Sequence, residues 1–365
     1  MFLPLHEFHE TLGARFAALN GVEAVADYGD APAEYAALTG SAGVLDLTFR
    51  GRLCLLGADR VRFLHGQVTN DIKKLRAGEG CYATLVTAKG KIQSDLNVFA
   101  LADELLLDFE PGLTRAVAVR LEKFIVADDV QVVDVAPHYG LLSVQGPKAD
   151  AVASELGWFP ELPTTPLGSV KSSTPAVGEL YLMNHPRLAP VAASGFDLFV
   201  PQAALGAVAD KLIAAAKAVG GRACGWNAFE TTRIEAGIPR YGADMDESTF
   251  PLECGLEARA VSYRKGCYIG QEVLNRIHSI GHVNRELRGF VLPADATSLP
   301  ARGDKLFRAD KEVGQLTSAV FSPKLKRIIA LGYVRREANQ PGAHLTLSTA
   351  TGNVTIEVAS LPFAG

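Results

Sequence analysis

From residue 287 to the C-terminal end, apolar residues come in short runs that glycine and proline interrupt. Short runs at this spacing, with turn signals between them, are typical of strands in an all-β unit. The region therefore predicts a small β barrel or sandwich of roughly 80 residues. Its expected strands are residues 289–292, 313–320, 328–334, 344–347 and 354–358.

The preceding residues mix strands and helices in no regular parallel order. Residues 6–20 carry apolar side chains at helical spacing before Gly21, which predicts an amphipathic helix. Residues 92–100 alternate between apolar and polar, which places Asp95 on the polar face of a strand. This mixture favours an α+β fold over a doubly wound sheet. The 365 residues exceed the roughly 250–300 that one core supports, so two or three domains are expected.

Composition and charge disfavour several classes of protein. The 36 Lys and Arg against 40 Asp and Glu give a net charge of -4, whereas nucleic-acid-binding proteins are usually basic. No apolar run reaches the ~18 residues that span a bilayer, and the N-terminus lacks the features of a signal peptide. We therefore expect a cytoplasmic protein with neither nucleic acid nor membrane as a partner. Five widely spread cysteines predict free thiols.

The densest group of unusual residues lies between 233 and 273. It contains RIEAGIPRYGADMDE (233–247), PLECGLE (251–257) and KGCYIGQEV (265–273). Arg233 follows Glu230 by three residues on a predicted helix, so the two can form a surface ion pair. Alternatively, Arg233 presents its planar donor groups to an acidic or heteroaromatic ligand. The spacing leaves both interpretations open.

Cys267 follows Arg264 and Lys265 and precedes a predicted helix start at Gly270. Positive potential at that position favours the thiolate, so a reactive thiol and a small packing residue are both open interpretations. Cys254, Cys267, His278 and His282 lack a CxxC pair, so no resident zinc ion or iron–sulfur cluster is expected. A cluster shared transiently between Cys267 and a partner remains open.

Positive charge gathers in the same part of the chain. Residues 259–288 carry six Arg and Lys against two Glu, and a second basic group follows between residues 324 and 336. Such groups form either a solvated face or a docking point for an anionic molecule.

The 233–272 group closely resembles the signature of the YgfZ family, whose members bind folate and support iron–sulfur cluster assembly or repair. KGCYIGQE is its most specific part. That family is related to the glycine-cleavage aminomethyltransferase, the T-protein. Segments resembling the same superfamily extend along nearly the whole chain: VLDLTFRGRLCLLGADRVRFLHGQVTND (44–71), LVTAKGKIQSDLNVF (85–99), LLSVQGPKA (141–149) and GFDLFVP (195–201).

The resemblance implies a ring of three subdomains around a tetrahydrofolate site, with a C-terminal antiparallel β barrel. The implied divisions are 1–49 with 136–250, an inserted domain at 50–135, a motif segment at 251–284 and the barrel at 285–365. The cofactor is tetrahydrofolate or a one-carbon derivative. The T-protein's pterin-binding acid falls on Asp197 and the arginine of its RxExG motif on Arg233. Further cofactor-binding residues are expected at Tyr241, Lys265, Gln271 and Glu272.

The T-protein's paired acids fall on Ser94 and Asp95, so one acid is missing. An acid beside the folate nitrogen can position it and stabilise its developing charge, and Asp95 is a candidate for that role. We expect Cys267, inside the most specific motif, to be a reactive thiol needed for function, with a role that the resemblance does not define. This cysteine and the lost acid together favour a YgfZ-like protein whose partners are iron–sulfur proteins or assembly factors. The alternative is an aminomethyltransferase of the glycine cleavage system.

Overall fold

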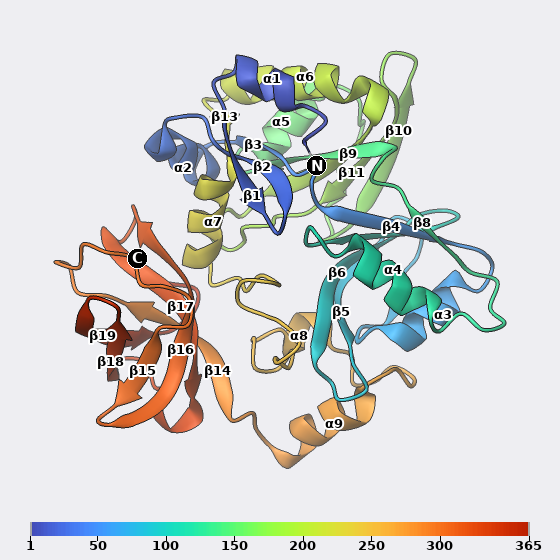
Figure 1. Ribbon diagram of the computed structural model, residues 1–365. Coiled ribbons are helices and arrows are strands. Elements are labelled where there is room, and N and C mark those ends of the chain that lie inside the picture. The colour runs from blue at the N-terminus through green and yellow to red at the C-terminus, as the bar shows by residue number, and fades with distance from the viewer. Residues whose placement is uncertain (1, 364–365) are drawn as a thin grey trace.

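The computed structural model describes residues 2–363. Figure 1 shows three parts: a six-stranded sheet with helices at the top, a five-stranded sheet at the lower right and a closed barrel at the lower left. The segment around α8 (Glu257–Ala260) lies between the last two parts. Within the described range, every helix is too short or too polar to cross a membrane.

The six-stranded sheet has the order β10-β11-β12-β9-β3-β13, and its pairs are antiparallel except β3 with β13. Apolar residues of α5 (Ala149–Leu156) and α6 (Leu205–Ala218) cover one of its faces. A short 3-10 helix at Gln202–Ala204 precedes α6. The strands are β3 (Gly43–Asp46), β9 (Tyr139–Gln145), β10 (Ser169–Thr174), β11 (Gly178–Asn184), β12 (Gly195–Pro201) and β13 (Arg222–Ala223).

The N-terminal segment corrects the predicted helix over residues 6–20. Helix α1 (His6–Thr11) is short, and β1 (Arg15–Leu19) and β2 (Val22–Asp27) form a two-stranded hairpin after it. Asn20 and Gly21 both adopt positive φ values, 50° and 80°, as a tight hairpin turn requires. Gly21 therefore turns a hairpin instead of ending a helix. Helices α2 (Ala31–Gly40) and α7 (Trp226–Glu235) pack together beside this hairpin.

The five-stranded sheet has the order β5-β6-β7-β4-β8 and is antiparallel throughout. It lies in the chain between β3 and β9, but the domain boundaries given above remain a prediction. Helices α3 (Arg60–Gln67) and α4 (Thr114–Glu122) and a 3-10 helix at Ile72–Lys74 accompany it. The strands are β4 (Gly51–Leu56), β5 (Gly80–Val86), β6 (Ile92–Ala100), β7 (Leu105–Phe109) and β8 (Gln131–Asp134).

Alternation along β6 separates two environments. Leu96 and Val98 enter the apolar core of the five-stranded sheet. Phe99 points to the opposite side and meets Phe199 of β12 edge to face, with ring centroids 6.3 Å apart. Because strand side chains alternate, Asp95 lies on the same side as Phe99. The polar face predicted for Asp95 is thus the face turned toward the six-stranded sheet.

The C-terminal barrel is closed and antiparallel, in the order β14-β17-β16-β15-β18-β19, which confirms the predicted all-β unit. Helix α9 (Gln271–Ile280) leads into it, and a 3-10 helix at Arg336–Ala338 follows β17. Its strands are β14 (Arg285–Val291), β15 (Lys305–Arg308), β16 (Lys311–Ser322), β17 (Arg327–Arg335), β18 (His344–Thr349) and β19 (Gly352–Ala359).

Candidate active site

A cavity of about 390 Å³ lies between the five-stranded sheet, the segment after β11, the end of α7 and α8. Small-molecule sites typically measure roughly 300–1,000 Å³, so the cavity can hold a substrate of that class. Asp95, Asn97 and Tyr82 contribute its wall from β5 and β6. Five arginines also line it: Arg50, Arg187, Arg233, Arg240 and Arg259.

The Asp95 carboxylate in this wall has one oxygen with a hydrogen-bond partner and one without, among the residues that the structure describes. The Tyr82 hydroxyl donates a hydrogen bond to its Oδ2 over 2.9 Å. Its Oδ1 is buried and has no hydrogen-bond partner among residues 2–363. Burial and then the charge of Glu110 raise the pKa of Asp95, while the Tyr82 hydrogen bond and Arg50 oppose that shift. Asp95 therefore carries one buried acceptor oxygen without a partner in a residue that lines the cavity.

Asp197, the predicted pterin-binding acid, lies on β12 and is fully buried. It does not line the cavity, but its two partners do. His185 Nδ1 lies 2.8 Å from its Oδ2, and the Arg187 guanidinium donates to the same oxygen over 2.7 Å. Burial alone would raise the pKa of Asp197, but the charges of Arg187 and His185 outweigh burial and lower it. Asp197 is thus an ionised anchor behind the cavity wall.

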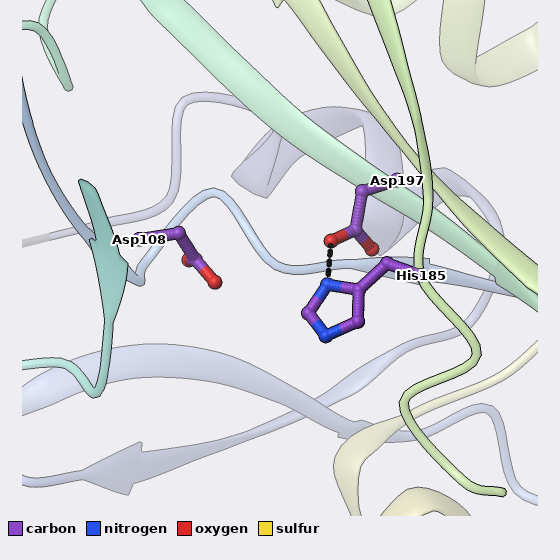
Figure 2. Close-up of side chains that lie close together, drawn as sticks. All are labelled: Asp108, His185 and Asp197. Carbon is purple, nitrogen blue, oxygen red and sulfur yellow. Dashed lines mark hydrogen bonds and ion pairs between the residues drawn. The ribbon is translucent and has the colours of Figure 1, made fainter. Parts of the chain in front are cut away.

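Asp108, His185 and Asp197 bring three donor atoms within 4.8 Å of one another (Figure 2). Histidine nitrogen and carboxylate oxygen atoms are common metal ligands. Here Arg187 donates to Asp108 over 2.8 Å and to Asp197 over 2.7 Å, so its guanidinium already joins the two carboxylates. Arg50 adds a second positive charge, 2.7 Å from Asp108. The geometry is that of a buried ion-pair cluster.

Arg233 forms the ion pair that its spacing allows, but at a buried position instead of on the surface. Its guanidinium does pair with Glu230 over 2.5 Å, but the side chain is only 2% exposed. It also binds Asp244 over 2.5 Å and donates to the Ser318 hydroxyl of β16 over 3.1 Å. Arg233 is therefore buried in the cavity wall and bound to the barrel, while Glu230 is partly exposed.

The charges of the wall form a continuous chain. Arg50 joins Asp108 to Glu110, and Arg240 joins Glu110 to Glu230 over 3.4 Å each. Burial would raise the pKa of Glu230, but Arg233 and Arg240 lower it. Alternating charges of this kind hold one another in place beside the cavity.

Lys265 lies outside the cavity lining and holds the motif segment to α3. Its Nζ donates to the backbone oxygens of His65, Val68 and Asn70 over 2.5, 2.7 and 2.8 Å. Burial lowers the pKa of Lys265 to about 8. Tyr241 is 9% exposed and belongs to the apolar cluster between α7 and the barrel. The structure gives both residues a packing environment.

The rest of KGCYIGQE also lies outside the cavity lining. Cys267 is exposed in the loop before α9, where Gln271 is the first helical residue and Glu272 is exposed. The other cysteines differ from Cys267: Cys54 and Cys224 are buried, and burial raises the pKa of both thiols. Cys81 contributes to the cavity lining, and burial raises the pKa of its thiol to about 12.

Residues 5–265 match the family described as the GCVT N-terminal domain, and residues 285–364 match the glycine cleavage T-protein C-terminal barrel domain. The chain belongs to the glycine cleavage T-protein family. The expected cofactor, tetrahydrofolate or a one-carbon derivative, is the cofactor of this family. The arginine-lined cavity is therefore a feature of a T-protein family member.

Relatives within the T-protein family align along nearly the whole chain. The aminomethyltransferase of Halothermothrix orenii is 28% identical over 99% of both chains. That of Ralstonia nicotianae is 30% identical over 99% of this chain and 96% of its own. The crystal structure of aminomethyltransferase T from Bartonella henselae superposes with a TM-score of 0.89 at 24% identity, covering 100% and 98% of the two chains, and shows the same fold.

These relatives correct the functional expectation drawn from KGCYIGQE. A YgfZ-like role in iron–sulfur cluster assembly or repair is wrong, because relatives over the full length are named aminomethyltransferase. The expected iron–sulfur partners have no support either. The expectation rested on KGCYIGQE, whose Cys267 lies in an exposed loop. Asp95 and the five arginines line the cavity, and no residue of KGCYIGQE does. The alternative aminomethyltransferase interpretation is the one supported.

Proposed function

We propose that this protein transfers an aminomethyl group to tetrahydrofolate in the cavity beside Asp95. The observation that carries the proposal is the unpaired, buried Oδ1 of Asp95 in a wall whose other carboxylate, Glu110, is paired with Arg50 and Arg240. Membership of the T-protein family and the full-length aminomethyltransferase relatives support the reaction class.

The cavity suits a reduced folate on chemical grounds. Its volume of about 390 Å³ accommodates a bicyclic ring, and Asp95 Oδ1 offers a hydrogen-bond acceptor for a ring N–H group. An unpaired buried acceptor costs roughly 1–3 kcal/mol, so a ligand that satisfies it gains comparable affinity. Bound tetrahydrofolate supplies the nitrogen that accepts the one-carbon unit.

Asp95 acts on that nitrogen in two ways. Its free Oδ1 holds the accepting nitrogen in place, and its negative charge stabilises the positive charge that develops there during transfer. Tyr82 fixes the carboxylate by holding Oδ2. A group held before the reaction begins stabilises the transition state without a cost of reorganisation.

Serine occupies position 94, where the T-protein carries the other acid of its pair. Ser94 is fully buried, and its hydroxyl donates to the backbone oxygen of Asp95 over 3.0 Å. Alternation along β6 turns its side chain away from the cavity face that carries Asp95 and Asn97. An acid at position 94 would therefore not reach the ligand, and Asp95 alone supplies the carboxylate.

The other predicted site residues take supporting roles in the proposal. Asp197 holds His185 and Arg187 against the cavity, and Arg233 joins the wall to the barrel. Lys265 and Tyr241 keep the motif segment and α7 in position. Cys267, Gln271 and Glu272 lie on a segment that is open to a macromolecular carrier of the aminomethyl group.

The test is direct. Purified protein, a lipoyl carrier protein loaded with an aminomethyl group and tetrahydrofolate are mixed, and release of ammonia and formation of the one-carbon folate are followed. We expect product only when all three are present. Tetrahydrofolate binding measured by calorimetry without product formation with any loaded carrier would contradict transferase activity.

A further inference from the structure

Arg259 differs from the other four arginines of the cavity wall. Arg50, Arg187, Arg233 and Arg240 each pair with at least one carboxylate. Arg259 forms no ion pair with any carboxylate in residues 2–363, and its side chain is exposed. The wall therefore presents one arginine whose charge is available to a ligand.

The backbone around Arg259 is fixed to the five-stranded sheet. The side-chain amide of Asn70 donates to the backbone oxygens of Tyr82 and Arg259, over 2.9 and 3.0 Å. The Thr69 hydroxyl donates to the backbone oxygen of Ala260 over 2.6 Å. These contacts hold the base of the arginine at one place on the cavity rim while its guanidinium stays exposed.

The guanidinium lies over the ring that also holds Asp95. Its central carbon is 4.5 Å from the centroid of the Tyr82 ring, within the range of a cation–π contact. The hydroxyl of the same ring binds Asp95. Tyr82 thus separates a carboxylate inside the cavity from an unpaired cation at its rim.

We propose that Arg259 binds the carboxylates of the glutamate end of tetrahydrofolate and so sets the direction in which the substrate enters. This inference rests on the proposed function. Arg259 can bind a carboxylate through two parallel hydrogen bonds, and its exposure leaves those donors accessible. Asp95 repels an anionic end, so opposite charges on either side of Tyr82 direct the ring inward and the carboxylates outward.

The experiment compares two ligands that share the pterin and aminobenzoate groups. Calorimetry measures the binding of tetrahydrofolate and of tetrahydropteroate, which lacks the glutamate, to wild type, Arg259→Gln and Arg259→Lys. Arg276→Gln is the matched control, because Arg276 is exposed on α9 and lies outside the cavity lining. Thermal unfolding verifies that each variant is folded.

We expect wild type to prefer tetrahydrofolate, and Arg259→Gln to bind it about three- to ten-fold more weakly while binding tetrahydropteroate unchanged. Arg259→Lys retains part of the preference, Arg276→Gln retains all of it, and added salt reduces it in wild type. Equal loss for both ligands, or no loss in Arg259→Gln, overturns the inference and leaves the proposed function intact. Failure of wild type to bind either ligand overturns both.

Discussion

The cavity wall and the KGCYIGQE segment differ in how their residues are brought together. The wall joins side chains that are far apart in the sequence, such as Arg187 and Asp108, which are 79 positions apart. KGCYIGQE is contiguous, and its cysteine is exposed in a loop. The contiguous motif therefore indicated the superfamily. The residues of the proposed active site are far apart in the sequence, and only the fold brings them together.

The largest expected effect concerns the buried ion pairs of the wall. Arg187→Ala leaves Asp108 and Asp197 without the guanidinium that joins them, and breaking a buried pair typically costs about 3–5 kcal/mol. Urea unfolding measures the loss. Cys267→Ser, in the exposed segment, is the contrasting control and should change the free energy of unfolding by less than about 0.5 kcal/mol. Equal losses of unfolding free energy in Arg187→Ala and Cys267→Ser would show that the buried ion pairs of the wall stabilise the protein no more than the exposed segment does.

Lys265 is the exception within KGCYIGQE, because its side chain is buried. Lys265→Met removes the donor from three backbone oxygens, and unsatisfied buried acceptors cost about 1–3 kcal/mol. Urea unfolding should therefore show a loss between those of the two preceding variants. A loss no greater than that of Cys267→Ser would show that the three hydrogen bonds do not anchor the segment.

Tyr82→Phe should shift the pH dependence of transfer with only a modest effect on the maximal rate. The Tyr82 hydrogen bond lowers the pKa of Asp95, so its loss raises that pKa further. The ionised carboxylate is the form that stabilises positive charge, so activity is lost as the pH falls through the pKa of Asp95. The acid limb of kcat/KM should therefore move to higher pH. An unchanged limb would show that Asp95 does not control it.

The smallest effect is kinetic and leaves the fold intact. Cys267 is exposed, whereas Cys54 and Cys224 are buried with raised thiol pKa values. Alkylation resolved by cysteine should modify Cys267 first near neutral pH, because the thiolate is the reacting form. Modification of Cys54 at the same rate would show that accessibility does not rank these thiols.

Sequence reasoning predicted the parts of the fold and site that depend on local pattern. The alternation of residues 92–100 identified the face that carries Asp95, and the short runs after residue 287 identified the barrel. Arg187 and Arg50 were missed, because their shared partner Asp108 lies 79 and 58 positions away and no spacing reveals such a pair. The hairpin at Asn20 and Gly21 was missed because an Asn-Gly turn and a helix end share the same residues.

In the proposed reaction, Asp95 is the carboxylate that holds the accepting nitrogen and stabilises its developing positive charge. Single-turnover transfer from a loaded lipoyl carrier protein to tetrahydrofolate should be about 100-fold or more slower in Asp95→Asn, with tetrahydrofolate binding largely retained. Ser94→Ala, one position away on the other face of β6, should transfer within about twofold of wild type. Transfer by Asp95→Asn at the wild-type rate would contradict this role of Asp95.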